Sequence, residues 1–596
     1  MGVSVVGSRS HRRAVNSIGA LVAPALVIIL TLIVIPVYFP TNDDSLAQQI
    51  FAGSISGEPL PYVTFMGYAW CWLVSKLFTV VPGVAWWTIL HLATIYISLS
   101  CFGIATLRTL DRLDRGFSPL KSFMLLLVLE CGVSVPLIGR LQFTTTGSLA
   151  ASTAVYVAIL ELLLRLRFPS TVDGGDGPDS LRFHVLPLLV PVFLMAIGYS
   201  YRPTCGYLAL GFWVLVMLIL IASRYSKTVL RMTRRAVIQL LLACLAVMAL
   251  WMVNKVAYSS PKWKNAFERG DAYAGLTDFP ATPYQEHPEL YEKVGWDESL
   301  YNIASSYWFF MDPRMTTDSL EKINDVNAWG IDELVEHPFE TVRSRTIEMR
   351  KPVALATVIV CTSMLIFLLR SVKDATYRST ALMTFLTAAV LLMYLFFKGR
   401  LPLRALMSVM LPSSAVLGAL VLMCTPKLRP KSFAENRMQR FWLMLHGMLV
   451  LLPAVAAVCQ FGYFSKDYLE QESRQANIDV FQSHAHQNPD TLFIYDYWAE
   501  LTPQTIWDID WPSNATQWGG WTYVMPWFDD VMKSQGFGGV PSTDSLLRDN
   551  VLFVNKDDFT RDLLIEDMKS LYGDDVDIDL VCMIGEGLRV YRFTLD

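Results

Sequence analysis

Apolar segments long enough to cross a lipid bilayer recur along most of this chain. A membrane-spanning helix needs about 20 mostly apolar residues, with a range of about 17–25. Eleven segments of this kind lie before residue 464, and we expect each to be a transmembrane helix. They are residues 17–39, 85–107, 121–139, 146–164, 184–200, 204–222, 236–257, 353–369, 379–397, 405–424 and 441–463. The pattern predicts a mainly α-helical, polytopic membrane protein.

Aromatic residues distinguish one further apolar segment, "YVTFMGYAWCWLVSKLFTVV" at 62–81. If this segment crossed the membrane, every later basic loop would lie on the outer side, against the positive-inside rule. We therefore expect an interfacial helix, whose Tyr and Trp side chains suit the head-group region and whose Lys76 can reach it. A twelfth span, with another segment miscounted, is the alternative.

Charged residues are scarce and unevenly placed. They make up 17% of the 596 residues, against roughly 25% in soluble domains, and hydrophobic residues make up 53%. Basic residues crowd the N-terminus and alternate connecting loops, so they indicate topology rather than nucleic-acid binding. The rule places the N-terminus in the cytoplasm and the C-terminal region outside a plasma membrane.

Three polar regions then lie outside, and they complete the predicted domain organisation. The first outer loop is 40–84 and an outer helical cap is 258–350, both within a transmembrane module at 1–464. The third region, 465–596, contains apolar runs such as "TLFIYD", "NVLFVN" and "LRVYRFTLD" with helical stretches between them. Short apolar runs bounded by turn residues are typical of buried strands, so we expect an extracytoplasmic α/β domain.

Charged side chains gather at the outer ends of the spans. Charges near the bilayer core are costly, so they are functional candidates by default. The candidates are Asp43 and Asp44 in "NDDSLAQQ", Arg140, Arg202, and Lys398, Arg400 and Arg404 in "KGRLPLR". Arg binds phosphate bidentately, and a carboxylate beside it can deprotonate an acceptor hydroxyl. The simpler explanations are capping of the following helix by the acids and snorkelling of the arginines.

In these features the chain resembles the GT-C superfamily of membrane glycosyltransferases. "NDDSLAQQIFAG" after the first span and the interfacial helix at 62–81 carry the resemblance. "SSPKWKNAFERGDAYAGLTDFPATPY", "KGRLPLR" and "NATQWGGWTYVMPWF" are similar to bacterial GtrII-like proteins that modify cell-surface polysaccharides. The match is mainly one of layout over most of the chain.

The resemblance implies a role for each candidate. Asp43 would be the catalytic base and Asp44 would assist it. Arg400 and Arg404 would bind the polyprenyl phosphate, with Arg202, Arg140 and Lys398 as further phosphate-binding candidates. The partners would be a polyprenyl-phosphate-linked sugar donor, a glycan or glycolipid acceptor and membrane lipids. No metal site is assigned, and a divalent cation remains open.

Two other classes of function remain as alternatives. A transporter or flippase of lipid-linked saccharides would also need outer cations and many spans, although it usually shows inverted repeats, which we do not find. A polymerase of lipid-linked saccharides would use the same chemistry. The segment 496–530 holds six tryptophans, at 498, 507, 511, 518, 521 and 527. They would serve either acceptor binding or a domain core, so we assign no acceptor residues.

Overall fold

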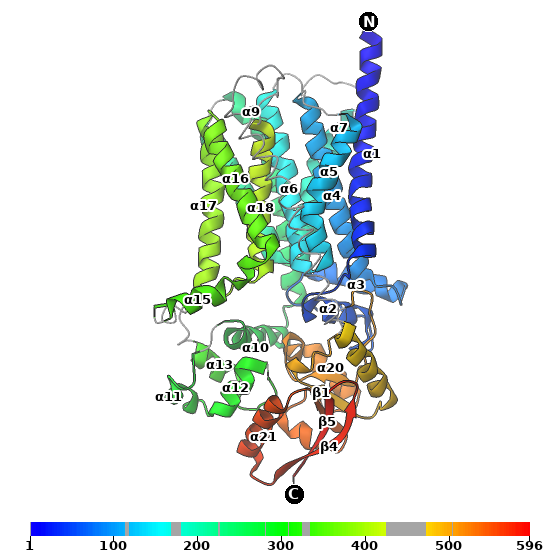
Figure 1. Cartoon of the computed structure of the whole chain (residues 1–596), viewed down its shortest axis with the longest axis vertical. Coiled ribbons are helices and arrows are strands. Elements are labelled where there is room, and N and C mark those ends of the chain that lie inside the picture. Colours follow the sequence, from blue (N-terminus) through cyan, green and yellow to red (C-terminus); the bar gives the residue numbers. More distant parts are fainter. Residues whose placement is uncertain are drawn as a thin grey trace.

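A bundle of long helices with a smaller lobe at one end makes up the computed structural model (Figure 1). The described residues are 2–113, 118–168, 180–223, 227–279, 282–307, 309–324, 334–335, 337–424, 472–502 and 505–595. Within them, nine helices are long and apolar enough to cross a membrane. These spans lie in α1 (Gly2–Val34), α4 (Trp86–Arg112), α5 (Pro119–Gly139), α6 (Phe143–Arg167), α8 (Pro203–Ser223), α9 (Lys227–Ala257), α16 (Pro352–Ser371), α17 (Ala375–Phe397) and α18 (Leu403–Cys424).

Two of the eleven expected spans need separate comment. The expected span at 184–200 falls in α7 (Ser180–Tyr201), of which Leu188–Tyr201 forms a shorter apolar helix. The expected span at 441–463 lies outside the described residues. The predicted polytopic helical fold with a small C-terminal sheet is confirmed.

The first outer loop forms two short helices between the bundle and the lobe (Figure 1). α2 (Asn42–Ala52) ends at Gly53, whose φ of 82° suits glycine at a helix C-terminus. A Cβ at this position would approach the carbonyl carbon of Glu58 to 2.6 Å. α3 (Tyr68–Val80) has 13 residues, which is too short to cross a bilayer. This length agrees with the interfacial helix expected at 62–81.

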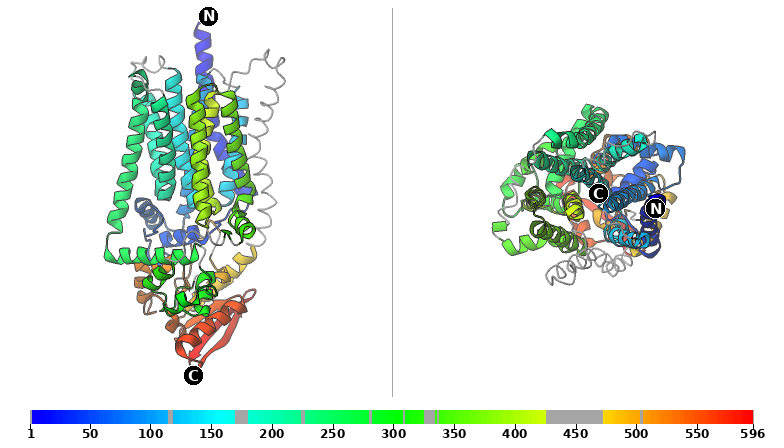
Figure 2. Two further views of the ribbon diagram at one scale, coloured as in Figure 1. Left: turned by 90° about the vertical axis from the view of Figure 1, so that its left-hand side faces the viewer. Right: turned by 90° about the horizontal axis from the view of Figure 1, so that it is seen from above.

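The lobe contains the outer cap and the C-terminal region. The cap is built from α10 (Pro261–Thr277), α11 (Pro288–Glu292), α12 (Glu298–Tyr307) and α13 (Thr317–Asn324), and α15 (Pro338–Arg345) and the 3-10 turn η2 (Ile347–Arg350) lead back to the bundle. The C-terminal region has the helices α20 (Pro526–Ser534) and α21 (Asp558–Tyr572) and the 3-10 turns η3 (Tyr497–Ala499), η4 (Trp521–Val524) and η5 (Thr543–Leu547). Figure 2 shows this lobe below the helices from a second side, with the two termini at opposite ends of the molecule.

One five-stranded sheet forms the centre of the C-terminal region, in the order β2-β1-β3-β5-β4. The strands are β1 (Leu492–Tyr495), β2 (Ala515–Gln517), β3 (Val551–Asn555), β4 (Val576–Ile584) and β5 (Leu588–Leu595). β1 pairs in parallel with β2 and β3, whereas β5 pairs antiparallel with β3 and β4. The three apolar runs expected to be strands correspond to β1, β3 and β5. Because β1 lies between β2 and β3, its carboxyl end lies between the ends of two parallel neighbours.

The cap and the sheet share one hydrophobic core. Buried residues of the cap, such as Trp296 and Phe309, belong to the same cluster as Phe493 and Phe553 of the strands. Phe309 contacts Trp518 with ring centroids 5.1 Å apart, and Trp518 stacks on Phe553 at 5.4 Å. Ile50 of α2 also belongs to this cluster. The lobe is therefore packed as one body that reaches the first outer loop.

Candidate functional site

The acidic pair lies inside the first turn of α2, at the end of the bundle that faces the lobe. The helix begins at Asn42 after Thr41, and the side chain of Thr41 makes no capping hydrogen bond. The expectation that Asp43 or Asp44 caps this helix is therefore wrong, because both residues are already helical. Acids in a first turn still complement the helix dipole. Consecutive helical residues point in directions about 100° apart, and this separates the two carboxylates.

Asp44 is directed into the bundle and is fully buried. Its Oδ1 accepts a hydrogen bond from the backbone nitrogen of Phe143 at 3.0 Å and another from Trp87 Nε1 at 3.3 Å. His91 Nε2 lies 3.5 Å from the same oxygen. Phe143 is the first residue of α6, so Asp44 caps a helix 99 residues further along the chain. Burial, and then the neighbouring charge of Asp43, raise the pKa of Asp44 well above its ordinary value.

Asp43 faces the other way, toward the start of α18. Its Oδ2 accepts a hydrogen bond from Arg404 Nη1 at 2.9 Å. Both side chains keep about one fifth of their surface exposed, at 19% for Asp43 and 22% for Arg404. A guanidinium has five N–H donors, so a single contact leaves Arg404 capacity for a second anion. This contact brings together two of the predicted site residues, one from each half of the transmembrane module.

Arg202 approaches the same place from the turn between α7 and α8. Its Nη1 donates to the Thr144 hydroxyl at 3.1 Å, and its guanidinium lies 5.3 Å from the centroid of the Phe143 ring. Gly147 and Gly198 make this approach possible, because a Cβ on Gly198 would meet the Gly147 carbonyl oxygen at 2.7 Å. Burial, and then the nearby charge of Arg404, lower the pKa of Arg202. Two guanidinium groups in one partly buried place favour an anionic ligand.

The remaining predicted cations make other contacts. Arg400 forms an ion pair with Asp278 at the end of α10, and its guanidinium lies 5.7 Å from the Phe279 ring. Its charge also contributes to the lowered pKa of Arg202. Lys398 directly follows α17, in the same turn. Arg140 lies 6.0 Å from the Tyr38 ring, and its backbone pairs with that of Tyr38. Arg400 and Arg404 thus contact different carboxylates.

The C-terminal region is attached directly to α2. Gln48, one turn after Asp44, donates through Nε2 to the backbone oxygens of Ile506 at 3.1 Å and Asp508 at 2.6 Å. The Thr88 hydroxyl of α4 also donates to the Ile506 oxygen. Tyr38 forms an antiparallel bridge with Thr505. These contacts hold residues 505–508, in the connection between β1 and β2, against α2 and α4.

No group of three or more His, Cys, Asp or Glu side chains in metal-binding arrangement occurs among the described residues. Both acids of the pair are already engaged, Asp43 with Arg404 and Asp44 with the first turn of α6. The arrangement of the described side chains is therefore that of one carboxylate among several guanidinium groups, which suits an anionic ligand beside a base.

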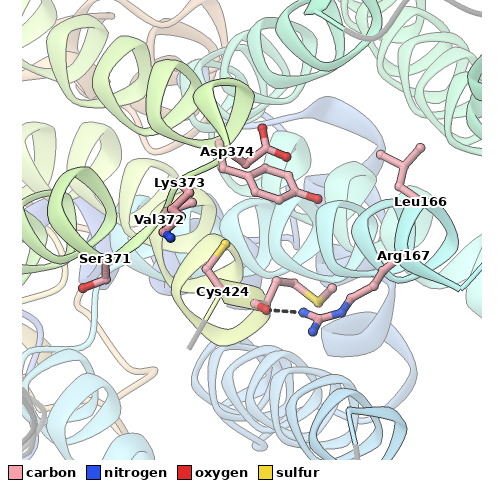
Figure 3. A pocket seen from close by; sticks show the side chains of 9 residues that line it. Leu166, Arg167, Ser371, Val372, Lys373, Asp374 and Cys424 are labelled. Atoms are coloured by element: carbon pink, nitrogen blue, oxygen red, sulfur yellow. Dashed lines mark hydrogen bonds between the residues drawn. The ribbon is translucent and has the colours of Figure 1, made fainter. Parts of the chain in front are cut away.

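The cavity shown in Figure 3 lies at the other end of the bundle. It has a volume of about 350 Å³ and is lined by the last turns of α6, α16 and α18 and the start of α17. There Arg167 Nη1 donates to the Met423 carbonyl at 2.7 Å, so this cation caps the C-terminus of α18. The 22 residues of α18 separate the cavity from Arg404 by about 30 Å. The cavity therefore takes no part in the site around Asp43.

Sequence reasoning missed several contacts of the site. Asp278, His91, Gln48 and Tyr497 were not among the candidates, although each lies in it or supports it. The available signal was position in the chain, because Gln48 lies one turn after Asp44 and His91 lies near the start of α4. No signal in one sequence distinguishes Asp278 from the other acids of the cap.

No known family model matches the chain, and no curated protein matches it. The solved structures that are similar to it in layout include the following two. ArnT from Cupriavidus metallidurans bound to undecaprenyl phosphate aligns over 96% of this chain and 97% of its own, with a TM-score of 0.39 and 11% identity. The Archaeoglobus fulgidus oligosaccharyltransferase in complex with zinc and sulfate aligns over 90% of this chain and 68% of its own, with a TM-score of 0.41 and 11% identity.

Proposed function

We propose that this protein is a membrane glycosyltransferase that moves a sugar from a polyprenyl-phosphate-linked donor to a cell-surface glycan or glycolipid. The observation that carries the proposal is the contact between Asp43 and Arg404 at the junction of the bundle and the lobe. This contact sets a carboxylate beside a guanidinium, the group that binds phosphate bidentately, and it supports a site for a lipid-borne donor. Arg202 adds a second guanidinium to the same place.

The reaction follows from these groups. Asp43 accepts the proton of an acceptor hydroxyl, and the hydroxyl oxygen forms a bond to the anomeric carbon of the donor sugar. The bond from that carbon to the phosphate oxygen breaks, and its electron pair leaves with the polyprenyl phosphate. Arg404 and Arg202 stabilise the charge that develops on the phosphate. Nothing is oxidised or reduced, and the atoms balance without a further reactant.

The two acids have different roles in this proposal. Asp44 is buried and holds the start of α6, so it positions α2 rather than touching the substrate. Arg400 is paired with Asp278 and lies at the edge of the phosphate site, together with Lys398. Arg140 supports the backbone of Tyr38 and contributes positive charge.

The test compares two matched variants, Asp43→Asn and Asp44→Asn, in cells that lack the gene. The sugar composition of the cell-envelope glycan is measured by mass spectrometry after complementation with each variant. We expect the wild type and Asp44→Asn to restore the modification and Asp43→Asn to leave it absent. Equal amounts of each variant in the membrane, measured by immunoblot, are the control. Restoration by Asp43→Asn would contradict the proposed base.

The proposed site must also lie on the outer side of a plasma membrane, with the N-terminus in the cytoplasm. Periplasm- or cytoplasm-dependent reporter proteins fused after residue 595 measure the side directly. We expect activity only from the reporter that works outside the cytoplasm. A C-terminal region inside the cell would contradict the use of a donor at the outer surface.

A further inference from the structure

Two adjacent aromatic side chains are exposed at the end of β1, an inner strand of the sheet. β1 is buried along its length, and Asp496 after it is also fully buried. Tyr497 and Trp498 then have 41% and 47% of their surfaces exposed, before Ala499 returns to the core. Their rings lie edge to face with centroids 5.4 Å apart. Aromatic residues at the carboxyl end of a parallel strand are at the edge where open α/β sheets bind ligands.

The turn that carries these rings is held firmly. Asp496 Oδ1 accepts a hydrogen bond from the Ala499 nitrogen at 2.5 Å and so caps the turn η3. Glu500 follows in the left-handed region with φ of 55°, which is uncommon for a residue with a side chain. Its carboxylate pairs with Arg474 at 2.7 Å and lies 4.0 Å from Lys556. Strained backbone persists where its surroundings over-determine it, and such positions cluster at ligand sites.

The same turn lies near Asp43, the proposed catalytic base. After burial, the negative charge of Asp43 is the next cause that raises the pKa of Tyr497. The contacts of Gln48 with Ile506 and Asp508 hold the segment that follows η3 against α2. The rings are thus placed on the lobe side of Asp43, whereas Arg404 and Arg202 approach it from the bundle.

We infer that Tyr497 and Trp498 form the binding platform for the acceptor saccharide, with Glu500 and Lys556 at its polar edge. The inference rests on the proposed function, because it assigns the acceptor side of that site. A sugar ring has an apolar face that packs on an aromatic ring and hydroxyls at its rim that need hydrogen-bond partners. The exposed rings supply the aromatic surface, and the ion-paired side chains of Glu500 and Lys556 supply the hydrogen-bond partners. A sugar hydroxyl on this platform would face Asp43.

The experiment measures binding of a defined probe to the purified full chain in detergent. The probe is fluorescently labelled cell-envelope glycan extracted from cells that lack the gene. We expect Tyr497→Ala and Trp498→Ala each to weaken its binding about three- to tenfold, the loss of one aromatic contact. Tyr497→Phe keeps the ring and should bind as the wild type does. The control is Leu580→Ala, an exposed apolar residue on β4, at the far edge of the sheet.

The outcomes separate this inference from the proposed function. Wild-type affinity in both alanine variants, or no binding of the glycan by the wild type, would overturn the platform. If the alanine variants lose binding to lipid vesicles without glycan to the same extent, the rings contact the membrane instead. This outcome also overturns the platform. If the alanine variants lose glycan binding while Asp43→Asn still restores the envelope modification, the platform stands and the proposed base is wrong.

Discussion

The buried carboxylate of Asp44 accepts a hydrogen bond from the backbone nitrogen of Phe143, 99 residues away, at 3.0 Å. One acid of the pair therefore joins α2 to the start of α6, while its neighbour contacts Arg404. The two acids are adjacent in the chain but differ in exposure and in partners. This difference leads to the first prediction.

We expect Asp44→Asn to leave the protein folded and active. The amide oxygen can accept from Phe143 and Trp87 as the carboxylate does, and the raised pKa of Asp44 already favours a neutral side chain. Asp44→Ala leaves both donors buried without this acceptor and should lower the free energy of unfolding by about 1–3 kcal/mol. Thermal unfolding of the purified variants measures the difference. An alanine variant as stable as the asparagine variant would contradict the capping role.

Arg404→Lys should weaken binding of a polyprenyl phosphate. Lysine keeps the positive charge beside Asp43 but lacks the planar fork that binds phosphate bidentately. We expect about a tenfold loss of affinity for undecaprenyl phosphate used as a probe, which corresponds to one charge-assisted hydrogen bond. Arg548→Lys is the matched control, because Arg548 is an exposed arginine of the lobe. Equal affinity in both variants would remove Arg404 from the phosphate site.

Gln48→Ala should loosen the C-terminal region from the bundle. The change removes the donor to the Asp508 oxygen and one of two donors to the Ile506 oxygen. Hydrogen exchange of residues 505–509, followed by mass spectrometry, should become faster while exchange within β3 stays slow. Gln482→Ala is the control, since Gln482 makes the same kind of bond to Asp510 at an exposed position. Unchanged exchange at 505–509 would show that Gln48 does not hold this segment.

The stability of the lobe should fall as the pH rises from about 4 to about 7. Burial raises the pKa of Asp496 to about 7, whereas an unfolded chain has an Asp pKa near 3.9. Between these values the folded state holds a proton that the unfolded state releases, so rising pH favours unfolding by roughly 4 kcal/mol at most. Asp496→Asn keeps the acceptor for Ala499 and removes the titration.

Tryptophan fluorescence during thermal unfolding at several pH values measures this dependence. We expect a shallower pH dependence for Asp496→Asn than for the wild type. Asp579→Asn on β4 is the control, because Asp579 is exposed and should leave the profile unchanged. A profile in Asp496→Asn that matches the wild type would mean that another group is responsible.

Much of the fold follows from hydropathy alone, because a bilayer imposes long apolar helices. The strands β1, β3 and β5 are also apolar runs. β4 was not expected: most of its residues are at least partly exposed, and its sequence "VDIDLVCMI" alternates polar and apolar residues only in its first half. β2 has three residues, too few for a pattern. Strands that take their stability from their neighbours leave a weak signal in sequence.

The sequence predicted that the site residues lie at the same end of the bundle, but it did not predict which of them pair with each other. Topology placed Asp43 and Arg404 at the same end of the bundle, and the structure brings them into contact. It did not indicate that Arg400 would pair with Asp278, 122 residues away in a region rich in acids. Asp44 rather than Asp43 caps α6 because Asp44 is the buried acid of the pair. Burial depends on tertiary packing, which one sequence does not display.

The single core of the lobe has a consequence for biosynthesis. Trp263 at the start of the cap and Phe593 near the end of the last strand belong to one hydrophobic cluster, although 330 residues separate them. At 5–20 residues per second, the ribosome needs roughly 15–65 s to make the intervening chain. During that time the cap lacks the strands that complete its core. The newly made cap therefore exposes apolar surface, to which chaperones can bind until the last strands are made.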